Sequence, residues 1–205
     1  MFMGDIQMKI TKQFLRELVS EAMRKESFLL DSPSLMQERK EAKYDRIIAA
    51  LEGKTPEIKT VGMMSGQNPM VKSVSPEENA NRKQALESEL KKRGFKFERI
   101  GAEFGGHPEQ SVLIMNPSQL EMDELCRMFQ QWGFVWGERY PMNAEQDFMG
   151  FTMFMIDYDR DIGWKKDPDS KEVGRVMKND EMSGAEDYSQ DPTSGKKFGL
   201  ELYEE

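Results

Sequence analysis

Polar side chains recur along residues 59–136, at points where the chain is expected to pass from one element to the next. The set consists of Ser65, Gln67, Asn68, Asn79, Arg82, Glu109, Ser111 and Gln131. Amides and hydroxyls bind ligands or peptides through hydrogen bonds, and an arginine near a helix N-terminus binds anions. Glu109 is the one evident acid, and it can pair with Arg82. These groups predict a binding site. Catalysis is not expected there, because the set holds no nucleophile–base pair and no metal-ligand cluster.

Residues with stronger chemistry elsewhere favour structural roles. His107 is the sole histidine and follows two glycines and precedes a proline, which is typical of a turn. Cys126, the sole cysteine, shares a predicted helix face with Met122 and Phe129, which favours burial over nucleophilic catalysis. One histidine and one cysteine leave only carboxylates to complete a zinc site. We therefore expect no catalytic residue, no metal and no cofactor.

An acidic stretch at 157–161 resembles the first half of a calcium loop. Such a loop needs a glycine at its sixth position and a bidentate glutamate at its twelfth. Ile162 and Pro168 occupy these two positions. The stretch is therefore expected to be an acidic loop without an ion.

Composition and charge indicate a soluble globular protein of 205 residues with a net charge of −8. The acidic excess lies in 141–205, and no strongly basic face appears in the summed charge. Nucleic-acid binding is thus disfavoured, and the cluster Lys91, Lys92 and Arg93 is expected to be a solvated helix end. No apolar run is long enough for a membrane span, and no secretory signal is evident. The expected location is the cytoplasm.

The elements that position the polar set begin with two N-terminal helices. One is expected from 11 to 25, with an apolar stripe at helical spacing, and the next starts at Ser32-Pro33 and ends before Gly53. Strands are expected at 58–65, 95–102, 111–116 and 134–137, with a further edge strand at 151–157. Two helices are expected after serine caps, from Ser75 to Gly94 and from Ser118 to about Trp132, before Gly133.

The order strand, helix, strand, strand, helix, strand predicts an α+β, ferredoxin-like βαββαβ domain. The first strand then runs antiparallel to the third and fourth, which brings the polar set to one end of the sheet. The expected organisation is an N-terminal helical extension over 1–54, the core domain over 55–157, and an acidic, largely irregular tail over 158–205. Within the tail, 198–203 is expected to dock as a short final strand or clip.

The stretch resembles a family of small uncharacterised bacterial and phage proteins, a domain of unknown function. The matching positions over about 59–137 are Ser65, Asn68, Pro69, Asn79, Arg82, Glu109, Ser111, Leu113, Ile114, Phe129, Gln131, Val135 and Trp136. The chain departs from the family pattern at Ser65-Gly66, which stand for Thr-Ala, and at Gln130, which stands for glycine. The family's usual N-terminal part is not evident in 1–54. The resemblance implies no activity.

Three functions follow from these observations. The leading expectation is a phage or bacterial accessory protein that binds a small ligand or a protein without chemistry of its own. An alternative is a nucleotide- or phosphoester-processing enzyme in which Glu109 is the base and Arg82 holds the anion. A third is a structural component of the virion.

Overall fold

The computed structural model describes residues 33–104, 107–142, 146–156, 164–166, 173–182 and 188–202. The chain divides into two compact units, Met1–Ala42 and Lys43–Glu205. Helix α2 (Pro33–Leu51) runs through this division, begins at the proline expected to start it, and is followed by Gly53 at φ 70°. The helix expected over 11–25 and the acidic loop at 157–161 lie outside the described residues.

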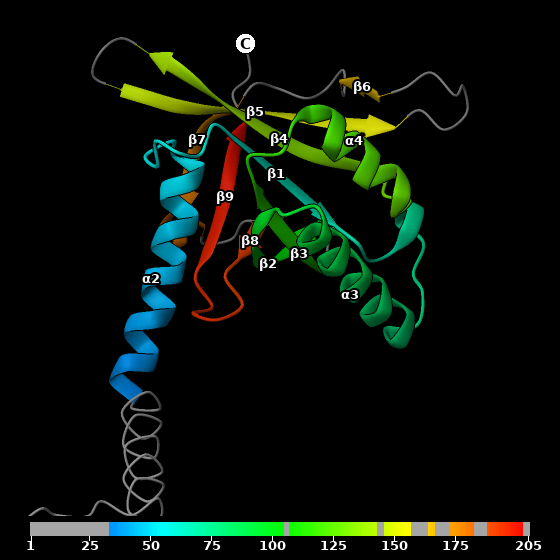
Figure 1. Ribbon diagram of the computed structural model, residues 1–205. Coiled ribbons are helices and arrows are strands. Elements are labelled where there is room, and N and C mark those ends of the chain that lie inside the picture. The colour runs from blue at the N-terminus through cyan, green and yellow to red at the C-terminus, as the bar shows by residue number, and fades with distance from the viewer. Residues whose placement is uncertain are drawn as a thin grey trace, which may run out of the picture. The chain divides into compact units, whose positions relative to one another are not determined.

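The described strands form one nine-stranded sheet in which each strand is antiparallel to its neighbours (Figure 1). The order across the sheet is β6-β5-β4-β1-β3-β2-β8-β9-β7. The bounds are β1 Thr60–Ser65, β2 Lys96–Phe104, β3 His107–Met115, β4 Gly133–Met142, β5 Gln146–Ile156, β6 Trp164–Lys166, β7 Val173–Lys178, β8 Tyr188–Gln190 and β9 Lys197–Leu202.

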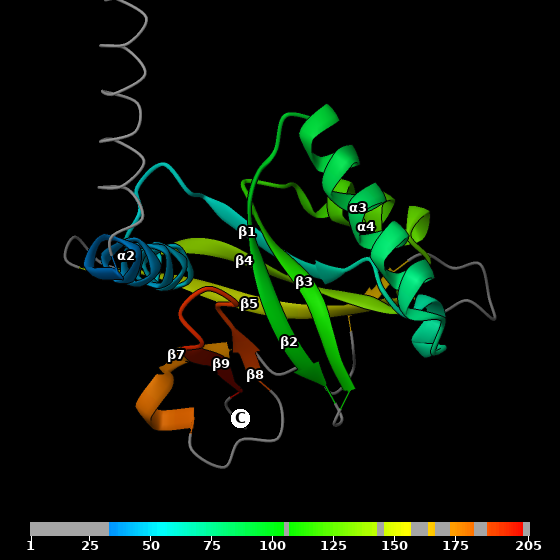
Figure 2. The ribbon, with the colours of Figure 1, turned by 90° about the horizontal axis from the view of Figure 1, so that it is seen from below.

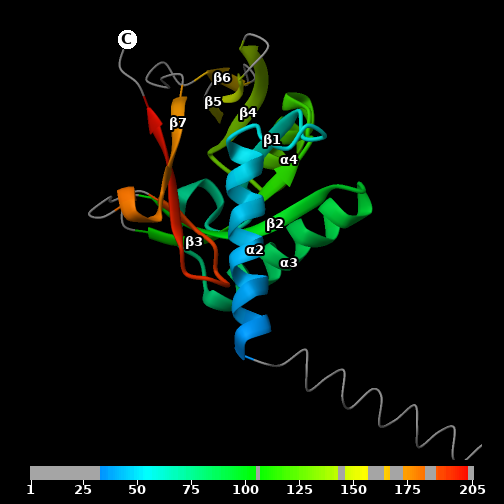
Figure 3. The same ribbon diagram turned by 90° about the vertical axis from the view of Figure 1, so that its left-hand side faces the viewer.

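The predicted small ferredoxin-like fold is wrong, because the sheet continues past four strands on both sides. β4 pairs with β5 along the whole length of β4, and β8 pairs with β2. The tail, which was expected to be largely irregular with a short strand or clip at 198–203, contributes β6 to β9, and Figure 3 shows β7 and β9 side by side. Val176 and Phe198 anchor these two strands in the core. Phe198, Leu200 and Leu202 alternate along the chain and indicated β9, whereas the sequences of β6, β7 and β8 show no such alternation.

Residues of the central strands alternate between two cores, as the pleat of a sheet requires. Val61 and Leu113 pack with the part of α2 that belongs to the second unit, residues 43–51. Val112 and Ile114 belong to the other core, which includes side chains of α3 (Pro76–Lys92) and α4 (Gln119–Met128). Figure 2 shows α3 and α4 together on one side of the central strands.

Helices α3 and α4 begin at the predicted caps. Ser75 Oγ accepts a hydrogen bond from the Glu78 N–H at 3.1 Å, and Ser118 forms a complete capping box with Glu121. Gly94 follows α3 at φ 79°. The predicted end of α4 near Trp132 is wrong, since the helix ends at Met128 and the chain is left-handed two residues later.

The turn expected at His107 and Pro108 is also wrong. Both residues open β3, and the ladder between β2 and β3 extends to the pair Phe104 and His107. The ladder leaves only Gly105 and Gly106 between the two strands, so the third strand is longer than the apolar run at 111–116 indicated. Within the described residues, no helix is long and apolar enough to cross a membrane.

Candidate functional site

The loop that follows β1 is tied to β3 by side chains of the predicted polar set. Ser65 pairs with Ser111 across the two strands. Ser65 Oγ accepts from the Gln67 N–H at 2.9 Å and donates to the Gln110 carbonyl at 3.3 Å. Gln67 Oε1 accepts from the Gln110 N–H at 2.7 Å. These bonds hold the end of β1 against the start of β3.

Asn68 connects this loop to α3. It lies in the left-handed region at φ 46°, which asparagine adopts more readily than most residues. Its N–H donates to Asn79 Oδ1, and Asn79 Nδ2 donates back to Asn68 Oδ1, each at 2.9 Å. Asn68 Nδ2 donates to Glu109 Oε1 at 2.8 Å. Asn68 therefore joins the first turn of α3 to β3.

Arg82 connects α3 to the end of α4. Its Nε donates to the Gly66 carbonyl at 2.9 Å, and its Nη2 donates to the Phe129 carbonyl. The second contact places a cation at the negative end of the α4 dipole, which stabilises the helix. Among the described residues, Arg82 forms no ion pair. The expected pairing with Glu109 is absent there, since that carboxylate holds Asn68 instead.

A glycine allows α3 to approach β1 this closely. A Cβ built on Gly66 would lie 3.2 Å from the Arg82 carbonyl oxygen and 3.2 Å from Leu86 Cβ. The absence of a side chain at 66 therefore lets the helix bring Arg82 within reach of both carbonyls.

Gln131 joins the loop after β1 to the loop after α4. Its Nε2 donates to the Gln67 carbonyl at 2.8 Å and to the Phe129 carbonyl at 3.2 Å. A backbone bond from the Met70 N–H to the Gln130 carbonyl, at 2.8 Å, adds a second link. Seven predicted residues thus belong to one arrangement, here called the two-loop network: Ser65, Gln67, Asn68, Asn79, Arg82, Glu109 and Gln131.

Ser111, the eighth predicted residue, lies beside the two-loop network without joining it. It is buried opposite Ser65, and its hydroxyl makes no hydrogen bond within the described part of the chain. The eight residues lie close together because β1 pairs with β3 and β4. The sequence predicted these two pairings, although the whole sheet differs from the predicted one.

The turn after α4 is a Schellman motif with an unusual residue at its left-handed position. The Gln131 N–H donates to the Cys126 carbonyl at 2.8 Å, and the Gln130 N–H donates to the Arg127 carbonyl at 3.1 Å. This pattern normally has glycine at the left-handed position, because a Cβ is strained there. Gln130 occupies it at φ 52°. Its exposed side chain makes no hydrogen bond among the described residues.

Apolar side chains flank this strained turn on the surface. Met128 is 53% exposed and Trp132 is 48% exposed. The polar pattern that predicted the network did not reveal these residues. In the sequence, the sign of an unusual turn was Gln130, which stands where the family pattern has glycine.

Cys126, one of the side chains considered for nucleophilic catalysis, is poorly suited to that role. Burial raises the pKa of the Cys126 thiol far above its ordinary value, and that thiol contacts the Gly133 carbonyl at 3.3 Å. The thiol was expected to be buried, and it is fully buried in the core to which both α3 and α4 contribute. The side chain of His107 lies outside the described part of the structure.

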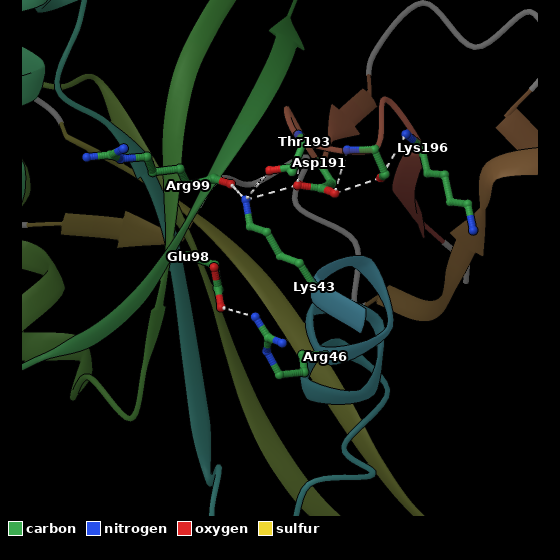
Figure 4. Close-up of polar contacts among 8 residues, drawn as sticks. Lys43, Arg46, Glu98, Arg99, Asp191, Thr193 and Lys196 are labelled. Atoms are coloured by element: carbon green, nitrogen blue, oxygen red, sulfur yellow. Dashed lines mark hydrogen bonds and ion pairs between the residues drawn. The ribbon is translucent and has the colours of Figure 1, made fainter. Parts of the chain in front are cut away.

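A second polar cluster, which the sequence did not reveal, joins α2 to the tail (Figure 4). Lys43 Nζ lies 2.9 Å from Asp191 Oδ1 and donates to the Arg99 carbonyl at 2.9 Å. Asp191 is fully buried in the turn between β8 and β9, and it also accepts from the N–H groups of Thr193 and Ser194. These bonds connect α2, β2 and the final hairpin.

The charge of Asp191 is maintained despite its burial. Burial, the largest single influence, raises the pKa of this carboxyl. Hydrogen bonds from the Ser194 hydroxyl, from Lys43 and from the backbone together outweigh it and hold the pKa below its ordinary value. The cluster has its hydrogen bonds satisfied internally, so its chemistry supports a structural role.

The basic residues at the end of α3 are engaged with acids. Arg93 Nε lies 2.8 Å from Glu89 Oε1, and its Nη1 lies 3.0 Å from Glu124 Oε2 on α4. Lys92 also pairs with Glu89, at 3.3 Å. These contacts fit the solvated helix end that the sequence predicted.

A comparison of the chain with protein-family models gives one match. Residues 64–133 match the model of a family described as "Protein of unknown function (DUF3293)". The match runs from the end of β1 to the start of β4 and so includes the whole two-loop network. It confirms the resemblance to an uncharacterised domain family over less than half of the chain. No curated protein matches the chain.

Proposed function

We propose that this chain is a non-catalytic protein-binding module that contacts its partner with the turn after α4. The contact surface, here called the α4 turn, consists of Met128, Gln130 and Trp132. One observation carries the proposal. The two-loop network holds a strained turn in place, while the outward side chains of that turn make no hydrogen bond or ion pair with the described part of the chain.

The strain at the α4 turn has no structural benefit that glycine would not supply. A side chain in the left-handed region costs about 1–2 kcal/mol relative to glycine. Asn68 and Met70, in the adjoining loop, are also left-handed, at φ 46° and 54°. Strained residues persist where surrounding bonds fix them, and they cluster at functional sites. The strain therefore supports a role for the outward side chains.

The exposed side chains suit a protein interface. Tryptophan and methionine are enriched at the centres of interfaces, where tryptophan often contributes much of the binding energy. The network supports positioning over chemistry, because Arg82 is bound to two carbonyls and Glu109 to an amide. A small ligand is not part of this proposal, since the polar groups expected to bind it bond to one another. The accessory role in a bacterium or phage, in the cytoplasm, remains part of it.

Affinity capture from the organism that carries the gene, quantified by mass spectrometry, tests the proposal. The baits are the wild type, Trp132→Ser and a matched control, Leu120→Ser. Leu120 is also an exposed apolar residue of α4, about two turns from Met128. We expect one set of proteins to be captured by the wild type and by Leu120→Ser and lost from Trp132→Ser, at equal thermal midpoints. Equal capture by all three baits would refute the proposal.

A phosphoester screen separates this function from the enzymatic alternative. The binding proposal expects no hydrolysis by the wild type. Hydrolysis that disappears in Glu109→Gln, at an unchanged thermal midpoint, would favour the enzyme in which that residue is the base.

A further inference from the structure

We infer that the last strands of the chain form a strap that opens while β1 and β3 stay folded, and that the ion pair of Lys43 with Asp191 keeps it closed. The strap consists of β7, β8, β9 and the short helix η2 (Asn179–Met182). The inference does not rest on the proposed function, because the strap contains no residue of the α4 turn.

The strap is joined to the central strands by a short ladder. β7 and β9 pair with each other from Val173 to Lys178. Among the described residues, the hydrogen-bonded ladder from the strap to the central strands runs through β8 alone, which pairs with residues 101–103 of β2. By contrast, β2 pairs with β3 along its whole length. A segment held by so short a ladder opens more readily than the centre of the sheet.

The strap contributes few side chains to the core that contains Val61 and Leu113. Val176 and Phe198 are buried there, and Leu200 is partly buried against them. Met182 is also buried, but it packs within the strap, since a Cβ built on Gly199 would lie 2.9 Å from its Sδ. Apolar burial therefore gives the strap a smaller hold on the domain than the central strands have.

Polar contacts with α2 and the residue after it supply much of the remaining attachment. Tyr44 Oη donates to the Lys197 carbonyl at 3.0 Å and accepts from the Asn179 N–H at 3.3 Å. Lys178 Nζ lies 2.6 Å from Glu52 Oε1. These residues of α2 and the strap all belong to the second compact unit.

The pair of Lys43 with Asp191 differs from these contacts because its carboxylate is fully buried (Figure 4). The bonds of Asp191 to Thr193 and Ser194 lie inside the strap and survive its opening. The bond to Lys43 is the one that opening breaks. A buried ion pair adds little net stability, whereas a buried charge without its partner is strongly destabilising. The presence of Lys43 therefore decides whether the closed strap is favoured.

Opening changes what β2 presents to the solvent. β2 lies within the family-matched segment 64–133, whereas every residue of the strap comes after it. Release of β8 frees main-chain N–H and C=O groups at 101–103, and such groups at a sheet edge pair with other extended segments. The closed strap thus shields an edge of the family-matched segment.

Hydrogen exchange measured by mass spectrometry on the full chain tests the inference. The proteins are the wild type, Lys43→Met and a matched control, Arg46→Met. Arg46 lies on the same helix and pairs with Glu98 at 3.2 Å, but its side chain is 63% exposed. Its variant therefore removes the same charge without leaving a fully buried carboxylate unpaired.

The detached strap has no helix to pack on, so its amides should exchange once it opens. In the wild type, we expect strap amides to share one rate at least about tenfold faster than that of β1 and β3 amides. Lys43→Met should raise this rate by at least about tenfold, and Arg46→Met by less than about threefold. The gap between strap and β1 should persist in Lys43→Met, because the open and the unfolded chain both lack the pair.

Strap amides that exchange as slowly as β1 amides in the wild type would overturn the inference, because the strap would then open only with the whole domain. This comparison needs no variant, so it holds even if Lys43→Met fails to fold. Equal rates in Lys43→Met and Arg46→Met would overturn the role of the ion pair. Both results leave the proposed function standing, since capture that depends on Trp132 is measured separately.

Discussion

Replacing Gln130 with glycine should stabilise the protein. Relief of the left-handed conformation is worth about 1–2 kcal/mol, and the greater freedom of glycine in the unfolded chain removes about 0.4–1 kcal/mol of this. The side chain of Gln130 makes no hydrogen bond among the described residues, and the bond from Met70 uses the backbone carbonyl, which glycine retains. The net gain should be about 0.5–1 kcal/mol. Urea denaturation measures it, with an unchanged slope as the sign that only stability has altered.

Two controls isolate the backbone effect. Gln130→Ala removes the side chain but keeps the strain, so stability should change by less than about 0.5 kcal/mol. Gly94→Ala tests the reverse change at another helix end, where φ is 79° and a built Cβ meets no atom within 4 Å. It should destabilise by about 1 kcal/mol. The reasoning fails if Gln130→Gly lowers the midpoint, or if Gln130→Ala stabilises as much as Gln130→Gly does.

Four further changes test the contacts around this turn, in the tail and in the core. Arg82→Ala should cost about 2 kcal/mol in urea unfolding, because the Gly66 carbonyl loses its side-chain donor and the Phe129 carbonyl keeps only Gln131. Lys43→Met should cost about 3 kcal/mol by the same assay, since it leaves the buried Asp191 carboxylate without its cation. The lowered pKa of Asp191 means that its contribution is present above about pH 4 and lost as the pH falls further, so thermal midpoints of Asp191→Asn should vary less with pH below 4. Gly137→Ala should lower the midpoint by an amount equivalent to about 1–3 kcal/mol, because its Cβ would lie 2.7 Å from the buried Phe151 ring.

The parts of the fold that sequence could predict are those with local physical signals. Ser75 and Ser118 start helices because each oxygen accepts a backbone N–H three residues on, a contact that depends on nothing distant. The alternation in β2 and the short apolar run in β3 likewise report which faces are buried. These signals were sufficient to place Ser65 beside Ser111, and hence to gather the polar set.

The parts that sequence could not predict depend on distant partners. Asp191 reads as one of many acids in a polar tail, yet it is fully buried because Lys43 reaches it from α2. Lys43 and Thr193, which meet in the same cluster, are 150 residues apart in the chain. β6 and β8 are only three residues long, and each pairs with a neighbouring strand of the sheet. The apolar run at 151–157 indicated the extension beside β4, but no local pattern indicated that β8, β9 and β7 would extend the sheet beside β2.

The residue at which α4 ends differs from the prediction, and this difference bears on the exposure of Trp132. Gly133 was expected to stop the helix because glycine is the residue that best tolerates the left-handed position. The chain instead turns at Gln130, where Arg82 and Gln131 fix the neighbouring Phe129 carbonyl. Because the helix ends before Gln130 and not at Gly133, Trp132 lies outside the helix, and its side chain is half exposed. Glycine at 130 would hold the same turn with less strain, so stability alone does not explain glutamine there. The proposed partner contact supplies a reason for glutamine, since position 130 lies between Met128 and Trp132 in the sequence and its side chain is exposed.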